Sequence, residues 1–230
     1  MVEILFEKGD IYKKISSVIA DLINQILSEK NELILGLPGG RSISNILQFL
    51  KMENIDWNKV HVFMIDERLA SLDDDESNFK LIKQGLSDVI PSKNLHPFRY
   101  NETEDDHGLL EYKEEIMQYG GKYDIILVSS GEDGHIGALY PNHHSIHNES
   151  SDLISMNDSP KPPKNRMSIS KKNLLKSKIG ILIFVGDMKR EAYSNFLDKE
   201  IDITKCPAKL ITQLPKSFVL TDIELKEEIV

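Results

Sequence analysis

Short apolar runs alternate with stretches of helical periodicity along most of this chain. Such a run, without alternating polar residues, is typical of a strand that is buried on both faces. A helix between two such strands makes them parallel strands of one sheet. We therefore expect an α/β fold, a three-layer, doubly wound and largely parallel sheet with helices on both faces. The expected strands are residues 2–6, 33–37, 60–65, 125–128 and 179–185.

The helices are expected between these strands, and one polar segment interrupts the pattern. This polar segment, residues 142–165, contains Pro160, Pro162 and Pro163. Long irregular segments in compact domains are usually functional or mobile, so we expect it to border a site. The expected helices cover residues 15–27, 42–52, 79–86 and 111–119, and a further helix begins near Met188.

The size and composition of the chain favour one domain. With 230 residues, 40% of them hydrophobic, the chain can bury one sizeable core, so a single domain is expected over residues 1–230. The net charge of -9 argues against a broadly basic nucleic-acid surface. Anionic metabolites are compatible with this charge, because a few arginines can make a local positive pocket. The expected partner is a small molecule and no nucleic acid, and the oligomeric state is left open.

The sequence lacks the features of a secreted or membrane protein. Residues 1–10 contain no basic region followed by an apolar core, so no secretory signal is expected. No apolar stretch approaches the roughly 20 residues that span a bilayer. Cys206 is the single cysteine, which excludes an intrachain disulfide and favours a structural thiol. We expect a cytoplasmic protein with no membrane contact.

Four of the expected strands are followed by conspicuous polar or glycine residues. Ligands of open α/β sheets bind just beyond the carboxyl ends of the strands, so these positions form the candidate site. After the second strand come Gly39, Gly40, Arg41 and Ser42, at the start of a helix. Bare N–H groups at a helix N-terminus suit a phosphate, and Arg41 adds further donors. The alternative is a simple glycine turn.

Charged residues follow two more of these strands. Asp66, Glu67 and Arg68 come directly after the third strand, where they form either part of a site or a surface ion cluster. Lys189 comes shortly after the fifth strand, at the start of a helix. It lies either in the pocket or in solvent.

The segment from Gly131 to His135 follows the fourth strand and is the strongest candidate. A histidine titrates near neutral pH, so His135 can serve as a general base. The neighbouring Asp133 and the two glycines favour a site over a histidine that merely packs against a turn.

Three further histidines lie in the polar segment. His143, His144 and His147 lie in a polar loop, so they form no helical i, i+4 pair of the kind that the H-E-x-x-H zinc motif places on a helix. We therefore interpret them as solvated and expect no metal site. The chain has no G-x-S-x-G motif either, so a serine hydrolase is not supported.

Several ordered blocks resemble the 6-phosphogluconolactonase family, which belongs to a larger group with the glucosamine-6-phosphate deaminases. The resemblance extends over nearly all of the chain. Residues 64–82 resemble the D-E-R block of the family with its downstream Ser-Asn pair. The sequence GEDGHIGALYP resembles its G-x-D-G-H block, and residues 159–170 are similar to its S-P-K-P-P…R segment. Gly39-Gly40 looks like its sugar-phosphate loop, and residues 186–192 look like its final helix start.

This resemblance implies hydrolysis of 6-phospho-D-glucono-1,5-lactone, a phosphorylated sugar lactone, without a metal or other cofactor. His135 would take a proton from the attacking water, and backbone N–H groups of residues 131–134 would stabilise the oxyanion. Asp133 would orient the imidazole or a substrate hydroxyl. The implied substrate-binding residues are Gly39, Gly40, Arg41, Ser42, Asp66, Arg68, Arg166 and Lys189.

Two other functions stay open. The first is a deaminase or isomerase of glucosamine 6-phosphate, but the glutamate of those enzymes is replaced here by Tyr140. They also have no counterpart of Lys161-Pro162-Pro163. The second is a non-catalytic sugar-phosphate-binding protein. Such domains usually accompany a DNA-binding region, for which this acidic chain leaves no room.

Overall fold

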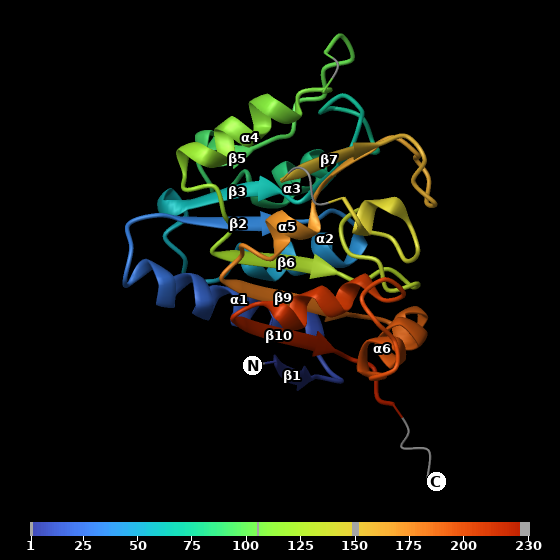
Figure 1. Cartoon of the computed structure of the whole chain (residues 1–230). Helices are drawn as coiled ribbons and strands as arrows, with labels where there is room; N and C mark the ends of the chain where they lie inside the picture. The colour runs from blue at the N-terminus through green and yellow to red at the C-terminus, as the bar shows by residue number, and fades with distance from the viewer. Residues whose placement is uncertain (1, 105, 149–151, 226–230) are drawn as a thin grey trace, which may run out of the picture.

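The fold is built on one parallel sheet of seven strands (Figure 1). The computed structural model describes residues 2–104, 106–148 and 152–225. Within them, all neighbouring strands of this sheet run parallel, which confirms the expected doubly wound architecture. In spatial order the strands are β1 (Val2–Phe6), β10 (Lys216–Thr221), β9 (Ile179–Phe184), β6 (Ile125–Ser129), β2 (Leu33–Leu37), β3 (Val60–Met64) and β5 (Leu95–His96).

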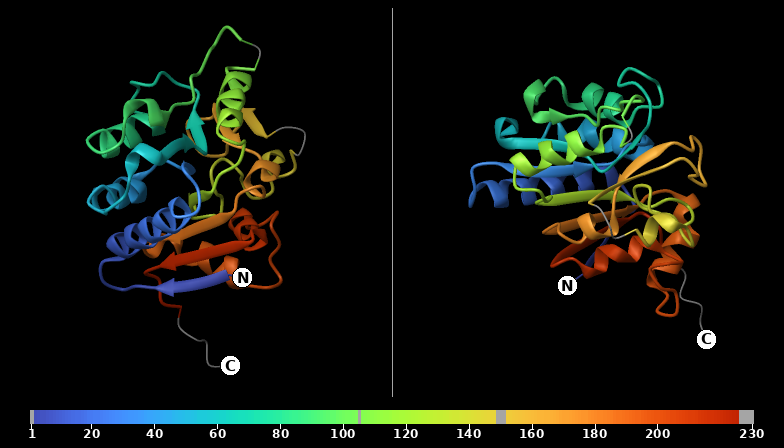
Figure 2. Two further views of the ribbon diagram at one scale, coloured as in Figure 1. Left: turned by 90° about the vertical axis from the view of Figure 1, so that its left-hand side faces the viewer. Right: turned by 45° about the horizontal axis from the view of Figure 1, so that its top comes forward.

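Helices cover both faces of the sheet (Figure 2). On one face α1 (Ile11–Leu27), α2 (Arg41–Leu50) and α3 (Asn78–Leu86) lie in a row, with α2 in contact with both others. On the other face lie α4 (Leu109–Gln118), α5 (Lys171–Leu174) and α6 (Arg190–Leu197). No helix in the described part of the chain has the length and apolar composition needed to cross a membrane. Short 3-10 helices are η1 (Trp57–Lys59), η2 (Ser92–Asn94), η3 (His144–Ile146), η4 (Asp187–Lys189) and η5 (Pro207–Gln213).

A second, antiparallel sheet of three strands begins where β3 ends. Its strands are β4 (Asp66–Arg68), β8 (Arg166–Ile169) and β7 (Leu153–Met156), with β8 in the middle. The sequence analysis did not predict this sheet, because strands of so few residues show no readable periodicity. The polar segment is accordingly less irregular than expected, since β7 lies within it. The pairing places Arg68 opposite Arg166, although the two residues lie far apart in the sequence.

The predicted elements of the main sheet agree with the structure to within a few residues. The sequence analysis missed β5 and β10. Strand β5 has only two residues, and the apolar part of β10 is the short run from Phe218 to Leu220. The helix expected near Met188 begins with η4 and continues as α6.

The strand order changes direction between β2 and β6, and this point positions the site. From β2 the sheet continues through β3 to β5, and from β6 it continues through β9 to β10. Crossovers that leave in opposite directions open a crevice at the carboxyl ends of the two central strands. The four strands that are followed by polar residues, β9, β6, β2 and β3, are adjacent in the sheet. Their carboxyl ends therefore meet at one edge.

Candidate functional site

A cavity of about 560 Å³ opens at the carboxyl ends of these four strands. This volume suits a small metabolite. Asp133 does not line the cavity but contacts His135, which does. The residues expected from the sequence that line the cavity are Gly39, Gly40, Arg41, Ser42, Asp66, Arg68, His135, Arg166 and Lys189.

His135 is held at the cavity wall by Asp133. Its Nδ1 lies 2.5 Å from Asp133 Oδ1, and its backbone N–H donates to the same oxygen at 3.2 Å. Partial burial opposes ionisation of Asp133, but the hydrogen bonds and charge of His135, together with the charge of Lys161, outweigh burial and lower the pKa of Asp133. The carboxylate therefore favours the tautomer with the proton on Nδ1, which leaves Nε2 as a proton acceptor. The imidazole is 21% exposed, so water can reach it.

Gly131 allows this histidine to lie against the turn that precedes it. A Cβ at position 131 would stand 2.0 Å from His135 Nδ1, which excludes every other residue type in this conformation. Within the turn, Gly131 N–H donates to the carbonyl of His135, and Gly134 N–H donates to the carbonyl of Gly131. These two N–H groups are not available to an oxyanion, which corrects the expectation that the whole turn supplies donors. The N–H groups of Glu132 and Asp133 make no hydrogen bond within the described residues.

Asp66 lines the cavity from β4 and is almost fully buried. Its Oδ2 accepts from Asn78 Nδ2 at 3.3 Å and lies 3.9 Å from Arg166 Nη1. Its Oδ1 is buried without a hydrogen-bond partner among the described residues. Burial raises the pKa of Asp66, against the opposing charges of Arg166 and Arg68. A buried oxygen without a partner at a cavity wall is expected to accept a hydrogen bond from a ligand.

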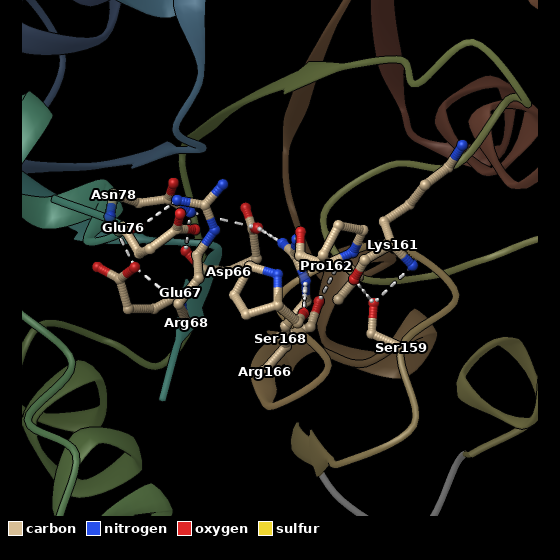
Figure 3. Close-up of polar contacts among 12 residues, drawn as sticks. Asp66, Glu67, Arg68, Glu76, Asn78, Ser159, Lys161, Pro162, Arg166 and Ser168 are labelled. Atoms are coloured by element: carbon tan, nitrogen blue, oxygen red, sulfur yellow. Dashed lines mark hydrogen bonds and ion pairs between the residues drawn. The ribbon is translucent and has the colours of Figure 1, made fainter. Parts of the chain in front are cut away.

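Two arginines stand beside this carboxylate, and both also contact the backbone (Figure 3). Arg166 donates from Nη2 to the carbonyl of Pro162 at 2.8 Å and from Nε to that of Pro163 at 3.1 Å. Arg68 donates from Nη1 to a backbone carbonyl in the loop before α3. These contacts hold the guanidinium groups in place, so their positive charge is preorganised at the cavity.

Glu67, the middle residue of the D-E-R block, caps a helix. Its carboxylate accepts from the N–H groups of Asn78 and Phe79 at 2.7 Å and from Ser77 Oγ at 3.2 Å. A carboxylate here satisfies N–H groups that have no partner within the helix. The cap joins β4 to α3 and fixes Asn78 against Gly39, where a Cβ would stand 1.8 Å from Asn78 Oδ1.

The glycine loop after β2 leads into the open N-terminus of α2. Gly40 is the N-cap residue, and no side chain caps this helix. The first-turn N–H groups of Arg41 and Ser42 therefore lack helical partners, and both residues line the cavity. Because the helix dipole adds positive potential, this loop offers a backbone site for an anion.

Lys189 is a partly buried cation in the cavity wall. Within the described residues its Nζ makes no hydrogen bond or ion pair. Burial lowers the pKa of Lys189, and Glu132 and Asp133 offset this only in part, while Lys161 and Arg41 add to it. An ammonium group in such a position is expected to attract an anionic ligand.

Lys161, Asn78 and Tyr12 also line the cavity, although the sequence analysis did not assign them to the site. Lys161 Nζ lies 3.8 Å from Asp133 Oδ2. Lys161 and Asn78 belong to the blocks that carry the family resemblance, so the sequence could have assigned both residues to the site. Tyr12 lies at the start of α1, where the apolar periodicity predicts only which face is buried.

The chain is similar to known proteins along most of its length. A family model described as glucosamine-6-phosphate isomerases/6-phosphogluconolactonase matches residues 7–220. Over 213 residues the chain is 33% identical to the 6-phosphogluconolactonase of Borreliella burgdorferi, and the match covers 90% of this chain and 91% of that protein. It is 28% identical to the 6-phosphogluconolactonase of Mycobacterium leprae, over 83% of each chain.

Solved structures share the fold. The 6-phosphogluconolactonase of Thermotoga maritima superposes with a TM-score of 0.85 at 23% identity, covering 96% of this chain and 99% of that one. A monomeric glucosamine-6-phosphate deaminase superposes with a TM-score of 0.78 at 22% identity, covering 96% of each chain. At these identities the similarity establishes the fold and does not separate a lactonase from a deaminase.

Proposed function

Because the chain belongs to the glucosamine-6-phosphate isomerase/6-phosphogluconolactonase family, we propose that it hydrolyses 6-phospho-D-glucono-1,5-lactone to 6-phospho-D-gluconate, in the oxidative pentose phosphate pathway. One observation carries the proposal. The Asp133–His135 pair stands at the wall of a cavity that also contains Arg68, Arg166 and Lys189. Hydrolysis of a phosphorylated lactone needs these two elements together, a base for water and cations for the phosphate.

The proposed chemistry uses only groups of the protein and water. Nε2 of His135 takes a proton from a water molecule as the water oxygen attacks the lactone carbonyl. Asp133 stabilises the imidazolium that forms, and the N–H groups of Glu132 and Asp133 are the proposed oxyanion donors. When the tetrahedral intermediate collapses, the ring C–O bond breaks and the imidazolium returns its proton to the leaving oxygen. No metal or other cofactor takes part in this scheme.

We assign the phosphate of the substrate to the part of the cavity wall that carries unpartnered donors. Lys189 and the first-turn N–H groups of Arg41 and Ser42 are the proposed direct contacts, because these donors have no hydrogen-bond partner in the described part of the chain. Arg68 and Arg166 add positive potential from their fixed positions. The unpartnered Oδ1 of Asp66 is left to accept from a sugar hydroxyl.

Tyr140 supports the lactonase over the deaminase. The side chain is buried, and its ring lies 4.8 Å from the ring of His135. Burial raises the pKa of Tyr140, so its hydroxyl is not a proton acceptor at neutral pH. Tyr140 therefore forms a wall against the imidazole, where a deaminase would need its glutamate. Release of ammonia from glucosamine 6-phosphate would contradict this assignment.

The test is to generate the lactone in the cuvette and follow its loss against the spontaneous rate. Wild-type protein is expected to accelerate the reaction, and His135→Ala is expected to remove the roughly 10²–10⁴-fold contribution of a general base. Circular dichroism of the variant checks that it folds. A wild-type rate equal to the buffer blank, with calorimetric binding of 6-phosphogluconate, would instead identify a non-catalytic sugar-phosphate-binding protein.

A further inference from the structure

We propose that His143, His144 and Asp158 form a binding site for one divalent transition-metal ion, with Zn²⁺ as the best-suited ion. The ligand atoms of the three residues all lie within 4.8 Å of one another. None of the three lines the cavity of the proposed reaction, so this site is separate from the catalytic chemistry.

The distances from Asp158 to the two histidines are close to those between ligand atoms of one coordination sphere. His144 Nε2 lies 3.0 and 3.1 Å from the two carboxylate oxygens of Asp158, and His143 Nε2 lies 3.5 Å from Asp158 Oδ1. Around a tetrahedral zinc with bonds of about 2.0–2.1 Å, neighbouring ligand atoms stand about 3.3 Å apart. A metal ion can therefore enter between these groups with little movement of the backbone.

The ring of His143 is held in the orientation that a metal ligand needs. Its Nδ1 lies 3.0 Å from Ser145 Oγ, and Ser145 is fully buried. Its Nε2 is itself buried and makes no hydrogen bond among the described residues. A buried nitrogen without a hydrogen bond is unfavourable, and a metal ion between it and Asp158 would satisfy it.

Coordination moves one proton within this ring. Without a metal, Ser145 N–H donates to His143 Nδ1 at 3.3 Å, so the ring proton lies on Nε2. A metal ion at Nε2 requires the proton on Nδ1, where Ser145 Oγ can accept it. Such an outer hydrogen bond is the usual support of a metal-bound histidine.

The donor set selects the class of metal. Two imidazoles and one carboxylate suit Zn²⁺ and its neighbours Co²⁺, Ni²⁺ and Cu²⁺, whereas Mg²⁺ and Ca²⁺ prefer oxygen ligands. The hydrogen bond from His144 lowers the pKa of Asp158, so the carboxylate is ionised at neutral pH. The side chains of His144 and Asp158 are 58% and 54% exposed, which leaves room for a water molecule as the fourth ligand.

The site would join two segments that flank the catalytic histidine. His143 and His144 lie at the start of η3, and Asp158 directly precedes the segment with Lys161, whose Nζ reaches Asp133. Tyr140 packs between the rings of His143 and His135. A bound ion would fasten both segments, so we expect it to stabilise the folded chain.

The sequence alone favours solvated histidines, because all three lie in a polar loop outside the expected helices. The third ligand, Asp158, lies 14 residues beyond His144. Only the path of the chain between η3 and β8 brings the carboxylate back to the imidazoles.

The experiment uses the full chain after treatment with a chelator. Zn²⁺ is titrated by calorimetry, and Co²⁺ is titrated by absorption spectroscopy, in which tetrahedral coordination produces strong visible bands. We expect one ion per chain and a higher Tm with Zn²⁺. His144→Ala and Asp158→Asn are each expected to weaken Zn²⁺ binding at least about tenfold. The control is His147→Ala, which removes an exposed histidine of the same loop and is expected to leave the affinity unchanged.

Three results would overturn the proposal. The first is unchanged affinity in both His144→Ala and Asp158→Asn. The second is loss of Zn²⁺ binding in His135→Ala, which would place the ion in the cavity. The third is the absence of saturable binding by the wild-type chain. Both ligand variants change exposed side chains, so circular dichroism is expected to show folded protein. The proposal does not depend on lactonase activity, because its readout is metal binding.

Discussion

Buried charged groups are paired differently at the two ends of the strands of the central sheet, here called the amino edge and the carboxyl edge. At the amino edge, where the strands begin, Asp124 precedes β6 with its side chain 2% exposed. One carboxylate oxygen accepts from Lys30 Nζ at 2.7 Å and from Ile34 N–H at 2.9 Å, and the other accepts from Lys178 Nζ at 2.7 Å. Burial opposes ionisation of Asp124, but these hydrogen bonds outweigh it and lower its pKa. Protein groups alone satisfy this charge.

At the carboxyl edge, the buried polar groups are only partly satisfied. Asp66 Oδ1 and Arg68 Nε are buried without hydrogen-bond partners among the described residues, and Lys189 Nζ makes no direct ion pair there. Since leaving such groups unpaired costs stability, their presence at the cavity supports the proposed binding of a ligand there. The buried charge of Asp124 therefore serves the fold, whereas Asp66, Arg68 and Lys189 are the charges that we assign to binding.

The largest expected effect is on catalysis at the carboxyl edge. Asp133→Asn replaces the carboxylate that orients His135 with an amide, which can present its N–H₂ group to Nδ1 and favour the wrong tautomer. We expect kcat to fall at least about 100-fold with little change in stability. The readout is the rate of lactone loss above the spontaneous rate. Glu132→Gln removes a neighbouring carboxylate that does not contact His135, so a fall of equal size there would contradict the assigned role of Asp133.

The next effect is on stability at the amino edge. Asp124→Ala leaves Ile34 N–H and two ammonium groups without their acceptor, and we expect the free energy of unfolding to fall by about 2 kcal/mol. Urea denaturation measures the change, and kcat/KM is expected to stay near the wild-type value. Asp75→Ala is the control, because the pair of Asp75 with Lys80 is exposed to solvent and contributes little to stability. Equal losses in the two variants would remove the contrast between the edges.

A smaller effect is expected from the unpaired lysine. Lys189→Met removes a proposed phosphate contact, and we expect KM to rise about tenfold while kcat changes little. Unlike Asp124→Ala, this variant is expected to unfold at the same or a higher urea concentration, because it removes a charge without a protein partner. Arg190→Met changes the adjacent cation, which pairs with Asp187 and does not line the cavity. An equal rise of KM in Arg190→Met would show that only general positive charge matters.

The smallest effect is the pH dependence of stability. Burial lowers the pKa of Lys189 below 10.5, the usual value for lysine. Between the lowered pKa of Lys189 in the folded chain and its usual pKa in the unfolded chain, the unfolded chain binds more protons than the folded chain. The free energy of unfolding therefore rises with pH in this range. Relative to Lys189→Met, the wild-type chain is expected to gain stability between neutral pH and about pH 10. Urea denaturation at both pH values measures the difference, and a constant difference would contradict the lowered pKa.

The local pattern of apolar residues in the sequence predicts the central strands of the main sheet. Strands β2, β3, β6 and β9 are short apolar runs because both of their faces are buried, and the helices between them show their buried side at regular spacing. The glycines and polar residues after these strands pointed to the correct edge, since parallel strands all end on the same side. The family resemblance then named many of the residues that line the cavity but not Lys161, Asn78 or Tyr12.

Only the tertiary structure shows which of these side chains are buried and which have a partner of opposite charge. Strand β4 pairs with β8, which buries Asp66 beside Arg166, and Glu67 turns away to cap α3. The polar segment returns Asp158 to His144. The sequence by itself determined the sheet and the positions of its polar ends, because periodicity and turn residues act over a few neighbours. Which charges are paired and which stay open depends on contacts between distant segments, and only the folded chain brings those segments together.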